Sequence, residues 1–271
     1  MLCPLHKLPK ELSGTREKTK RYALKRESQH GKAEVIAHHG ASTNPLWKVP
    51  SHKWVLCCSG LTNAEKEVVS EFTKMTGVSL SKTYGPNVTH IIASTDENGA
   101  CRRTLKFLMA ILEGRWILKI DWIKACMQAM EPVAEEGYQI SVDVHGIKDG
   151  PHLGRLRVMN KVINSSFNFN QSFSMGEFQP SYKGYLQDMV VAAGGYVLHR
   201  KPISGDMRGL PSESTTYIIY NAESEESGFA KKLLCSRRQD EAEALASSNG
   251  AKVAAHSWVL DSIAACNLQT L

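Results

Sequence analysis

The sequence contains one succession of motifs twice, and this repetition limits the folds that the chain can adopt. Three motifs recur in the same order: a helix pattern that runs through glycine into a short strand, an apolar strand that follows a Thr, and a strand that passes into a helix with a Trp. The pairs are residues 72–80 and 190–198, 88–94 and 215–221, and 116–125 and 252–264. Two copies of one unit therefore account for 271 residues better than a single large domain does.

The first copy predicts the element order β-α-β-β-α-β-α. Short, continuously apolar segments suit strands buried on both faces of a parallel sheet, whereas apolar residues three and four positions apart suit helices. The predicted strands are residues 54–58, 78–81, 88–93 and 115–120, and the predicted helices are 63–76, 102–114 and 121–130. We expect Thr62 or Asn63 to begin the first helix, Gly77 to end it, and Asp121 to cap the third. The predicted fold class is α/β, with a mostly parallel sheet and helices on both of its faces in each copy.

Positive charge is concentrated at the N-terminal end. Residues 1–50 contain ten Lys/Arg and four Asp/Glu, a net charge of +6, and the rest of the chain carries 23 charges of each sign. Few large apolar side chains occur between residues 12 and 43, too few to offset the entropy cost of folding. We therefore expect a basic, largely disordered tail at 1–46, folded copies at 47–130 and 164–271, and a linker at 131–163. The second copy has longer insertions, at 199–214 and 222–238, and its second helix is the least clearly defined element.

Three segments carry a resemblance to a known family: CSGLTNAE at 58–65, CRRTLKFLMAILEGRWILKIDWIKA at 101–125 and HSWVLDSIA at 256–264. They resemble the BRCT family, in particular the paired repeats of the breast-cancer susceptibility proteins and their RING-domain partners, including plant members. The resemblance covers about residues 54–271. It implies two BRCT repeats packed in tandem, each a small parallel four-stranded sheet flanked by helices. It also implies a nuclear adaptor that binds phosphoserine or phosphothreonine motifs in the DNA-damage response and repair.

Four residues of the first copy suit a phosphate site. Ser59 and Thr104 supply hydroxyl groups, Gly60 supplies a backbone N–H with no side chain in the way, and Lys106 supplies a positive charge near a helix start. Residues that match these four hold the phosphate in the family. Each of these residues also has a purely structural explanation. A Ser-Gly pair commonly ends a strand, Thr commonly caps a helix, and Lys on a helix is commonly a solvated charge.

The resemblance also implies a groove between the two repeats. Arg103 is expected to contact the peptide backbone near the third residue after the phosphoserine, and Leu108 and Phe178 are expected to line the groove. Leu108 suits the apolar core equally well. The second copy lacks the Thr-x-Lys pair after its third strand, so we expect no second phosphate site there. Its expected role is to support the first copy, through an interface formed by helices at 102–113, 181–193 and 256–265. Trp122 and Trp258 are each expected to pack their own helix against their own sheet.

The tail contains two further motifs. Cys3 and His6 form a Cys-x-x-His pair, which is half of a tetrahedral zinc site, and no matching pair lies near it. The pair resembles the end of a PHD-like finger, which precedes the repeats in plant members, and we expect no metal here. Residues 16–26 are strongly basic, as in nuclear-localisation or nucleic-acid-contacting segments, and a solvated linker would have the same composition.

Several classes of protein are not expected. The sequence has no P-loop, GxSxG or HExxH motif, and neither His90 nor His199 has an evident nucleophile partner, so we expect no catalysis, no cofactor and no small-molecule substrate. No apolar run approaches the roughly 20 residues that span a bilayer, so no membrane partner is expected. Seven scattered cysteines suit buried thiols better than a disulfide framework. The alternative function is a chromatin or nucleic-acid module that acts through the basic tail, weakly and with strong salt dependence, with the repeats as a scaffold.

Overall fold

The computed structural model describes residues 47, 53–159, 171–199, 215–248 and 250–271. The tail predicted for residues 1–46 lies outside these ranges, and so does nearly all of the insertion predicted at 199–214. Among the described residues, Trp47 is already part of the core, with 5% of its surface exposed and its ring edge against Phe72.

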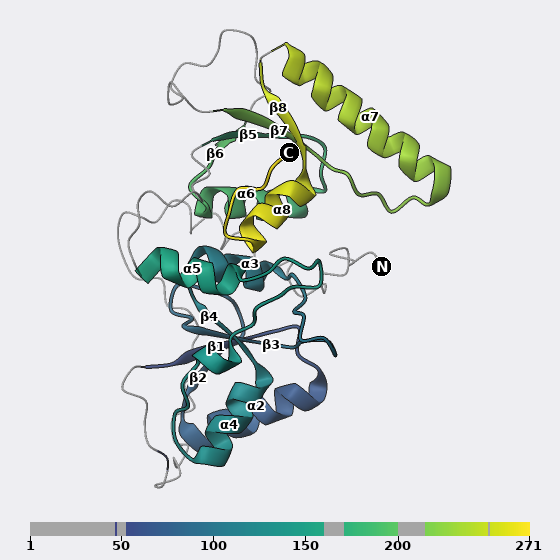
Figure 1. Cartoon of the computed structure of the whole chain (residues 1–271). Helices are drawn as coiled ribbons and strands as arrows, with labels where there is room; N and C mark the ends of the chain where they lie inside the picture. Colours follow the sequence, from purple (N-terminus) through teal and green to yellow (C-terminus); the bar gives the residue numbers. More distant parts are fainter. Residues whose placement is uncertain (1–46, 48–52, 160–170, 200–214, 249) are drawn as a thin grey trace.

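Each copy of the repeated unit contains a parallel sheet of four strands (Figure 1). The first sheet has the order β2-β1-β3-β4, and the second has the same order, β6-β5-β7-β8. All adjacent strands in both sheets run parallel. The strands are β1 (Val55–Ser59), β2 (Ser79–Ser81), β3 (His90–Ala93), β4 (Trp116–Lys119), β5 (Ser172–Met175), β6 (Tyr196–Leu198), β7 (Thr216–Tyr220) and β8 (Lys252–Ala255). The predicted α/β class and the doubling of the unit are confirmed.

Local capping sets the helix ends in the first copy. Helix α2 (Asn63–Thr76) begins at Thr62, whose side chain accepts a hydrogen bond from the Glu65 N–H, and it ends at Gly77 with φ +71°. Both caps agree with the prediction. Helix α3 (Leu105–Leu112) begins later than predicted, because Thr104 caps it and leaves the two preceding arginines outside the helix.

Helix α4 (Ile120–Ala129) begins directly after β4, with Lys119 at its N-cap position. The prediction that Asp121 caps this helix is wrong. Asp121 lies in the first turn instead, where a negative charge still interacts favourably with the helix dipole.

The second copy holds α6 (Pro180–Ala192), α7 (Gly228–Ser247) and α8 (His256–Ala264). Helix α7 takes up more than half of the segment that was predicted as an insertion at 222–238, so this part of the prediction is wrong. The reason is that only Ala242 and Ala246 are fully buried along its 20 residues. The helix therefore lacks the broad apolar stripe by which a sequence reveals a helix.

Helices from both copies meet in one apolar layer between the two sheets (Figure 1). Helix α3 packs against α6 and α8, as predicted. The buried side chains in this layer include Leu108 and Ile111 of α3, Met189 of α6, and Leu260 and Ile263 of α8. The layer fixes the second copy against the helix that begins at Thr104.

A further helix, α5 (Gly150–Met159), lies in the segment predicted as a linker, and sequence analysis did not identify it. It packs against both α3 and α8, and Gly150 and Gly154 allow the approach. A Cβ at Gly150 would lie 1.7 Å from the carbonyl oxygen of Ala264, and one at Gly154 would lie 2.3 Å from that of Ile111. The segment between the repeats is therefore part of their interface.

Trp122 and Trp258 occupy matching places in the two copies. Both side chains are buried, and each indole Nε1 donates to the carbonyl eleven residues later, Val133 or Gln269, at 2.9 Å. Trp122 stacks on His90, and Trp258 stacks on Tyr217 of β7. Each Trp therefore packs its helix against its own sheet, as predicted.

Candidate functional site

The structure brings Ser59 and Thr104 together. Ser59 is the last residue of β1 and Thr104 is the N-cap of α3, and their hydroxyl oxygens lie 2.6 Å apart. The Thr104 oxygen also accepts a hydrogen bond from the Phe107 N–H at 3.1 Å. This pair joins the carboxyl end of a central strand to a helix N-terminus, where backbone N–H groups and the helix dipole favour an anion.

Gly60 follows Ser59 and opens the loop that leads to α2. Its φ of +67° lies in the left-handed region that glycine adopts without strain, and nothing lies within 4 Å of where a Cβ would be. The capping box of Thr62 and Glu65 fixes the next residues, because the Glu65 carboxylate accepts from both the N–H and the hydroxyl of Thr62. The backbone at Gly60 therefore has free space beside it for a ligand, and strand β1 before it and the capping box after it fix its position.

Lys106 lies in the first turn of α3, and its ammonium group reaches back to the end of β1. The Nζ atom donates to the carbonyl of Cys58 at 2.9 Å and to that of Lys82 at 3.1 Å. An ammonium has three donors, and these carbonyls take two of them. Burial raises the pKa of the Cys58 thiol to about 11 against the opposing effect of Lys106, so this neighbour stays neutral. The positive charge is thus held beside Ser59 by backbone carbonyls.

Arg103 precedes this site, and its side chain is buried with 4% of its surface exposed. Its Nε donates to Asp143 at 2.8 Å, and its Nη1 donates to Asp261 of α8 at 2.6 Å. Asp143 lies between the repeats in sequence, and only 1% of its side chain is exposed. The guanidinium therefore links both repeats and the segment between them, and sequence analysis missed both aspartates, which lie 40 and 158 residues away.

The two other residues expected in the groove belong to the apolar layer between the repeats. Leu108 is 1% exposed inside the layer between the repeats, so in this structure it is a core side chain. Phe178 is partly buried at the edge of the same cluster, with its ring 5.8 Å from those of Tyr182 and His256. The role of both residues in a peptide groove stays a prediction.

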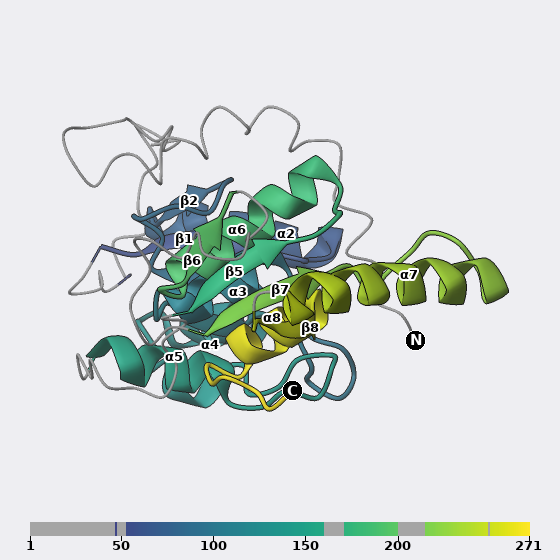
Figure 2. The same ribbon diagram turned by 90° about the horizontal axis from the view of Figure 1, so that it is seen from above.

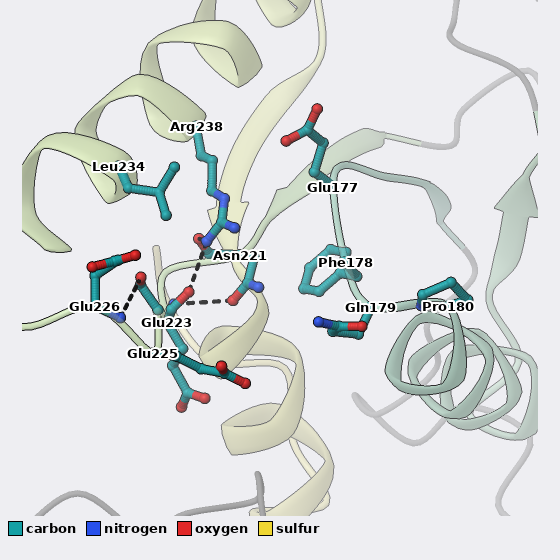
Figure 3. A pocket seen from close by; sticks show the side chains of 11 residues that line it. Glu177, Phe178, Gln179, Pro180, Asn221, Glu223, Glu225, Glu226, Leu234 and Arg238 are labelled. Atoms are coloured by element: carbon teal, nitrogen blue, oxygen red, sulfur yellow. Dashed lines mark hydrogen bonds between the residues drawn. The ribbon is translucent and has the colours of Figure 1, made fainter. Parts of the chain in front are cut away.

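Phe178 also lines a pocket of about 370 Å³ in the second repeat (Figure 3). The pocket lies between the β5–α6 loop, the β7–α7 loop and α7, with Phe178 on one side and Leu234 and Arg238 on the other. None of Ser59, Gly60, Thr104 or Lys106 lines it. The four-residue group and this pocket are thus separate features.

The part of the chain that the structure describes holds no group of three or more potential metal ligands, and no helix in it is long and apolar enough to cross a membrane. The six cysteines in these ranges are free thiols. Burial raises the pKa of Cys101 to about 12 and that of Cys126 to about 11. Cys3, His6 and the basic segment 16–26 lie outside the described residues.

Residues 52–127 match the family model of the BRCA1 C Terminus (BRCT) domain. The whole chain is 47% identical over 280 residues to the Protein BREAST CANCER SUSCEPTIBILITY 1 homolog of Arabidopsis thaliana, of which it covers 28%. It is 35% identical over 285 residues to the BRCA1-associated RING domain protein 1 of the same plant, covering 99% of this chain and 37% of that relative. The crystal structure of the S. pombe Brc1 BRCT5–BRCT6 domains matches with 16% identity and a TM-score of 0.49, over 80% of this chain and 95% of that one. The chain thus spans well under half the length of these two curated relatives.

Proposed function

Because the chain belongs to the BRCT family, with paired repeats of the type in these plant relatives, we propose that it binds phosphorylated segments of partner proteins. The phosphate would sit on Ser59, Gly60, Thr104 and Lys106. The observation that carries this proposal is that two hydroxyls and an ammonium lie together at the end of β1, next to a glycine with no heavy atom within 4 Å of its Cβ position. A phosphate carries about two negative charges and three acceptor oxygens, which matches this set of donors.

The donors are in place before a ligand arrives. Lys106 is already held by the Cys58 and Lys82 carbonyls, and the two hydroxyls are already 2.6 Å apart. Little side-chain entropy is then lost on binding, which favours affinity. An unphosphorylated serine offers neither the charge nor the additional acceptors, so binding should depend on the phosphate.

Specificity for the residues after the phosphate would come from the region between the repeats. Arg103 lies next to Thr104 in sequence and is tied to α8 through Asp261. Arg103 is proposed to contact the peptide backbone near the third following residue. Its guanidinium also pairs with Asp143 and Asp261, so the same residue holds the repeats together.

The partners proposed are phosphorylated nuclear proteins of the DNA-damage response and repair, including homologous recombination. The role is that of an adaptor in the nucleus, and it requires no catalysis. This proposal rests on the kinship with the two plant relatives and on the phosphate-site geometry. A second role, contact of the tail with DNA or histones, rests on the net charge of +6 in residues 1–50. Such binding would weaken steeply with salt and would survive Lys106→Ala.

Affinity selection tests the proposal. A library of fluorescent pSer-x-x-x peptides and its unphosphorylated twin would be titrated against the full chain, its Ser59→Ala variant and a Lys124→Ala control. Lys124 is an exposed residue of α4 that pairs with Asp121. We expect phosphate-dependent binding near the micromolar range, about −8 kcal/mol, lost in Ser59→Ala and retained in the control. Equal binding of both libraries would refute the assignment.

A further inference from the structure

The first two turns of α7 leave an apolar surface uncovered. Phe229 and Leu233 are 80% and 61% exposed, and Phe229 is the most exposed large hydrophobic side chain among the described residues. The helix extends beyond the second sheet at this end (Figures 1 and 2). A soluble domain rarely exposes such side chains together without a use for them.

These side chains continue into the pocket beside α7. At about 100° per residue, Phe229, Leu233, Ala230 and Leu234 fall within an arc of about 140° on the helix. Leu234 lines the pocket, where it lies opposite Phe178 (Figure 3). The exposed face of α7 and the wall of the pocket therefore form one continuous apolar path.

The pocket adds a strong negative charge to this path. Its lining includes four glutamates, Glu177, Glu223, Glu225 and Glu226, and one arginine, Arg238. The guanidinium of Arg238 donates to the carbonyl of Glu223 at 2.7 Å and so holds the β7–α7 loop against the helix. Arg237 also lies 3.8 Å from Glu177, so the four glutamates exceed the two arginines by two, and this surplus favours a positively charged ligand over an anionic one.

We infer that this surface, made by the first turns of α7 and the adjoining pocket, docks an unphosphorylated peptide segment of a partner protein in which a Lys or Arg lies between apolar residues. The basic side chain would place its charge among the glutamates and its aliphatic stem against Phe178 and Leu234. The apolar residues of the partner would cover Phe229 and Leu233. The opposite charge of this pocket separates it from the site at Lys106, and the inference does not depend on the function proposed there.

The test uses the full chain and a fluorescein-labelled library of nine-residue peptides without phosphate. Each has Arg or Lys at the centre and Leu, Ile or Phe three or four residues apart, and a twin library has Glu at the centre. Fluorescence polarisation would measure affinity for the wild type, for Phe229→Ser/Leu233→Ser and for Glu225→Lys/Glu226→Lys. All four substituted positions are exposed, so these variants should retain the fold, which thermal unfolding would check.

We expect the selected basic peptides to lose at least tenfold in affinity for each double variant. They should bind within twofold of wild type to Asp240→Lys, a single charge reversal on α7 outside the pocket, and to Lys106→Ala. The inference is overturned if the Glu-centred peptides bind as well, if both double variants bind normally, or if no peptide of the library binds the full chain.

Discussion

The hydroxyl oxygens of Ser59 and Thr104 lie 2.6 Å apart, although 45 residues separate the two positions in the chain. The contact joins the end of β1 to the N-cap of α3, the helix that also packs against the second repeat. A ligand held at this pair is therefore one helix away from the interface between repeats. Changes at the interface and changes at the site should consequently be coupled.

Thr104 caps α3 and also contacts Ser59, and substitutions should separate these two roles. Thr104→Val removes the oxygen that caps α3 and that contacts Ser59, so the free energy of unfolding should fall by about 1 kcal/mol and phosphopeptide binding should be lost. Thr104→Ser keeps the hydroxyl and should retain both properties. Ser59→Ala leaves the cap intact, so it should impair binding with little effect on urea denaturation. Equal loss of stability in Ser59→Ala and Thr104→Val would contradict this division.

Arg103→Leu should be among the most destabilising single changes in the chain. It leaves the buried Asp143 carboxylate without its guanidinium partner, and the expected loss is roughly 3–5 kcal/mol in urea unfolding. Asp261→Asn should cost less, because 37% of the Asp261 side chain is exposed to water. As a control, Arg103→Leu/Asp143→Leu should recover part of the loss. An Arg103→Leu protein as stable as wild type would show that the pairing is unimportant.

The two glycines of α5 should not tolerate a side chain. Gly150→Ala and Gly154→Ala would place a Cβ against the backbone carbonyls of Ala264 and Ile111, and either change should destabilise the protein by about 1–3 kcal/mol. Gly184→Ala in α6 is the matched control, since nothing lies within 4 Å of its new Cβ. It should be neutral or stabilising by up to about 1 kcal/mol, because Ala favours helices over Gly. Thermal unfolding measures all three.

The lowered pKa of Glu135 implies that the stability of the protein depends on pH. The hydrogen bond with His90 lowers the pKa of this carboxyl below its ordinary value of 4.5, against the opposing effect of burial. A carboxyl with a lowered pKa in the folded state stabilises the protein above about pH 4.5, and this contribution is lost as the pH falls through the folded-state value. Glu135→Gln should therefore be less stable than wild type at pH 6–7, and the difference should shrink below pH 4. A difference independent of pH in urea titrations would argue against this pairing.

The regular parts of the fold were accessible from sequence for physical reasons. Strands β1 and β3 are mostly apolar, and the caps at Thr62 and Gly77 follow local rules, so both strands and both caps were predicted. Helix α5 was missed because its apolar residues do not form a stripe: it packs through Gly150 and Gly154, and Met159 at its end is exposed. Helix α7 was missed in its first half for a related reason, since Phe229 and Leu233 face outward.

The candidate site, like the fold, could be predicted from the sequence only in part. The four residues of the proposed phosphate site lie on two short motifs whose resemblance to a family could be recognised, and the structure places Ser59, Thr104 and Lys106 around the end of β1. The partners of Arg103 could not be found, because Asp143 and Asp261 meet it only through tertiary packing. The burial of Leu108 likewise depends on how α6 and α8 pack against α3.

A thermodynamic cycle on Lys106 tests the central claim most directly. Calorimetry would give the affinities of one selected peptide, phosphorylated and unphosphorylated, for the full chain and for Lys106→Ala. If the ammonium contacts the phosphate, the phosphorylated peptide should lose about 1.5–3 kcal/mol in the variant while the unphosphorylated peptide is unaffected. If the two peptides lose the same free energy, Lys106 does not contact the phosphate and the proposed site is wrong.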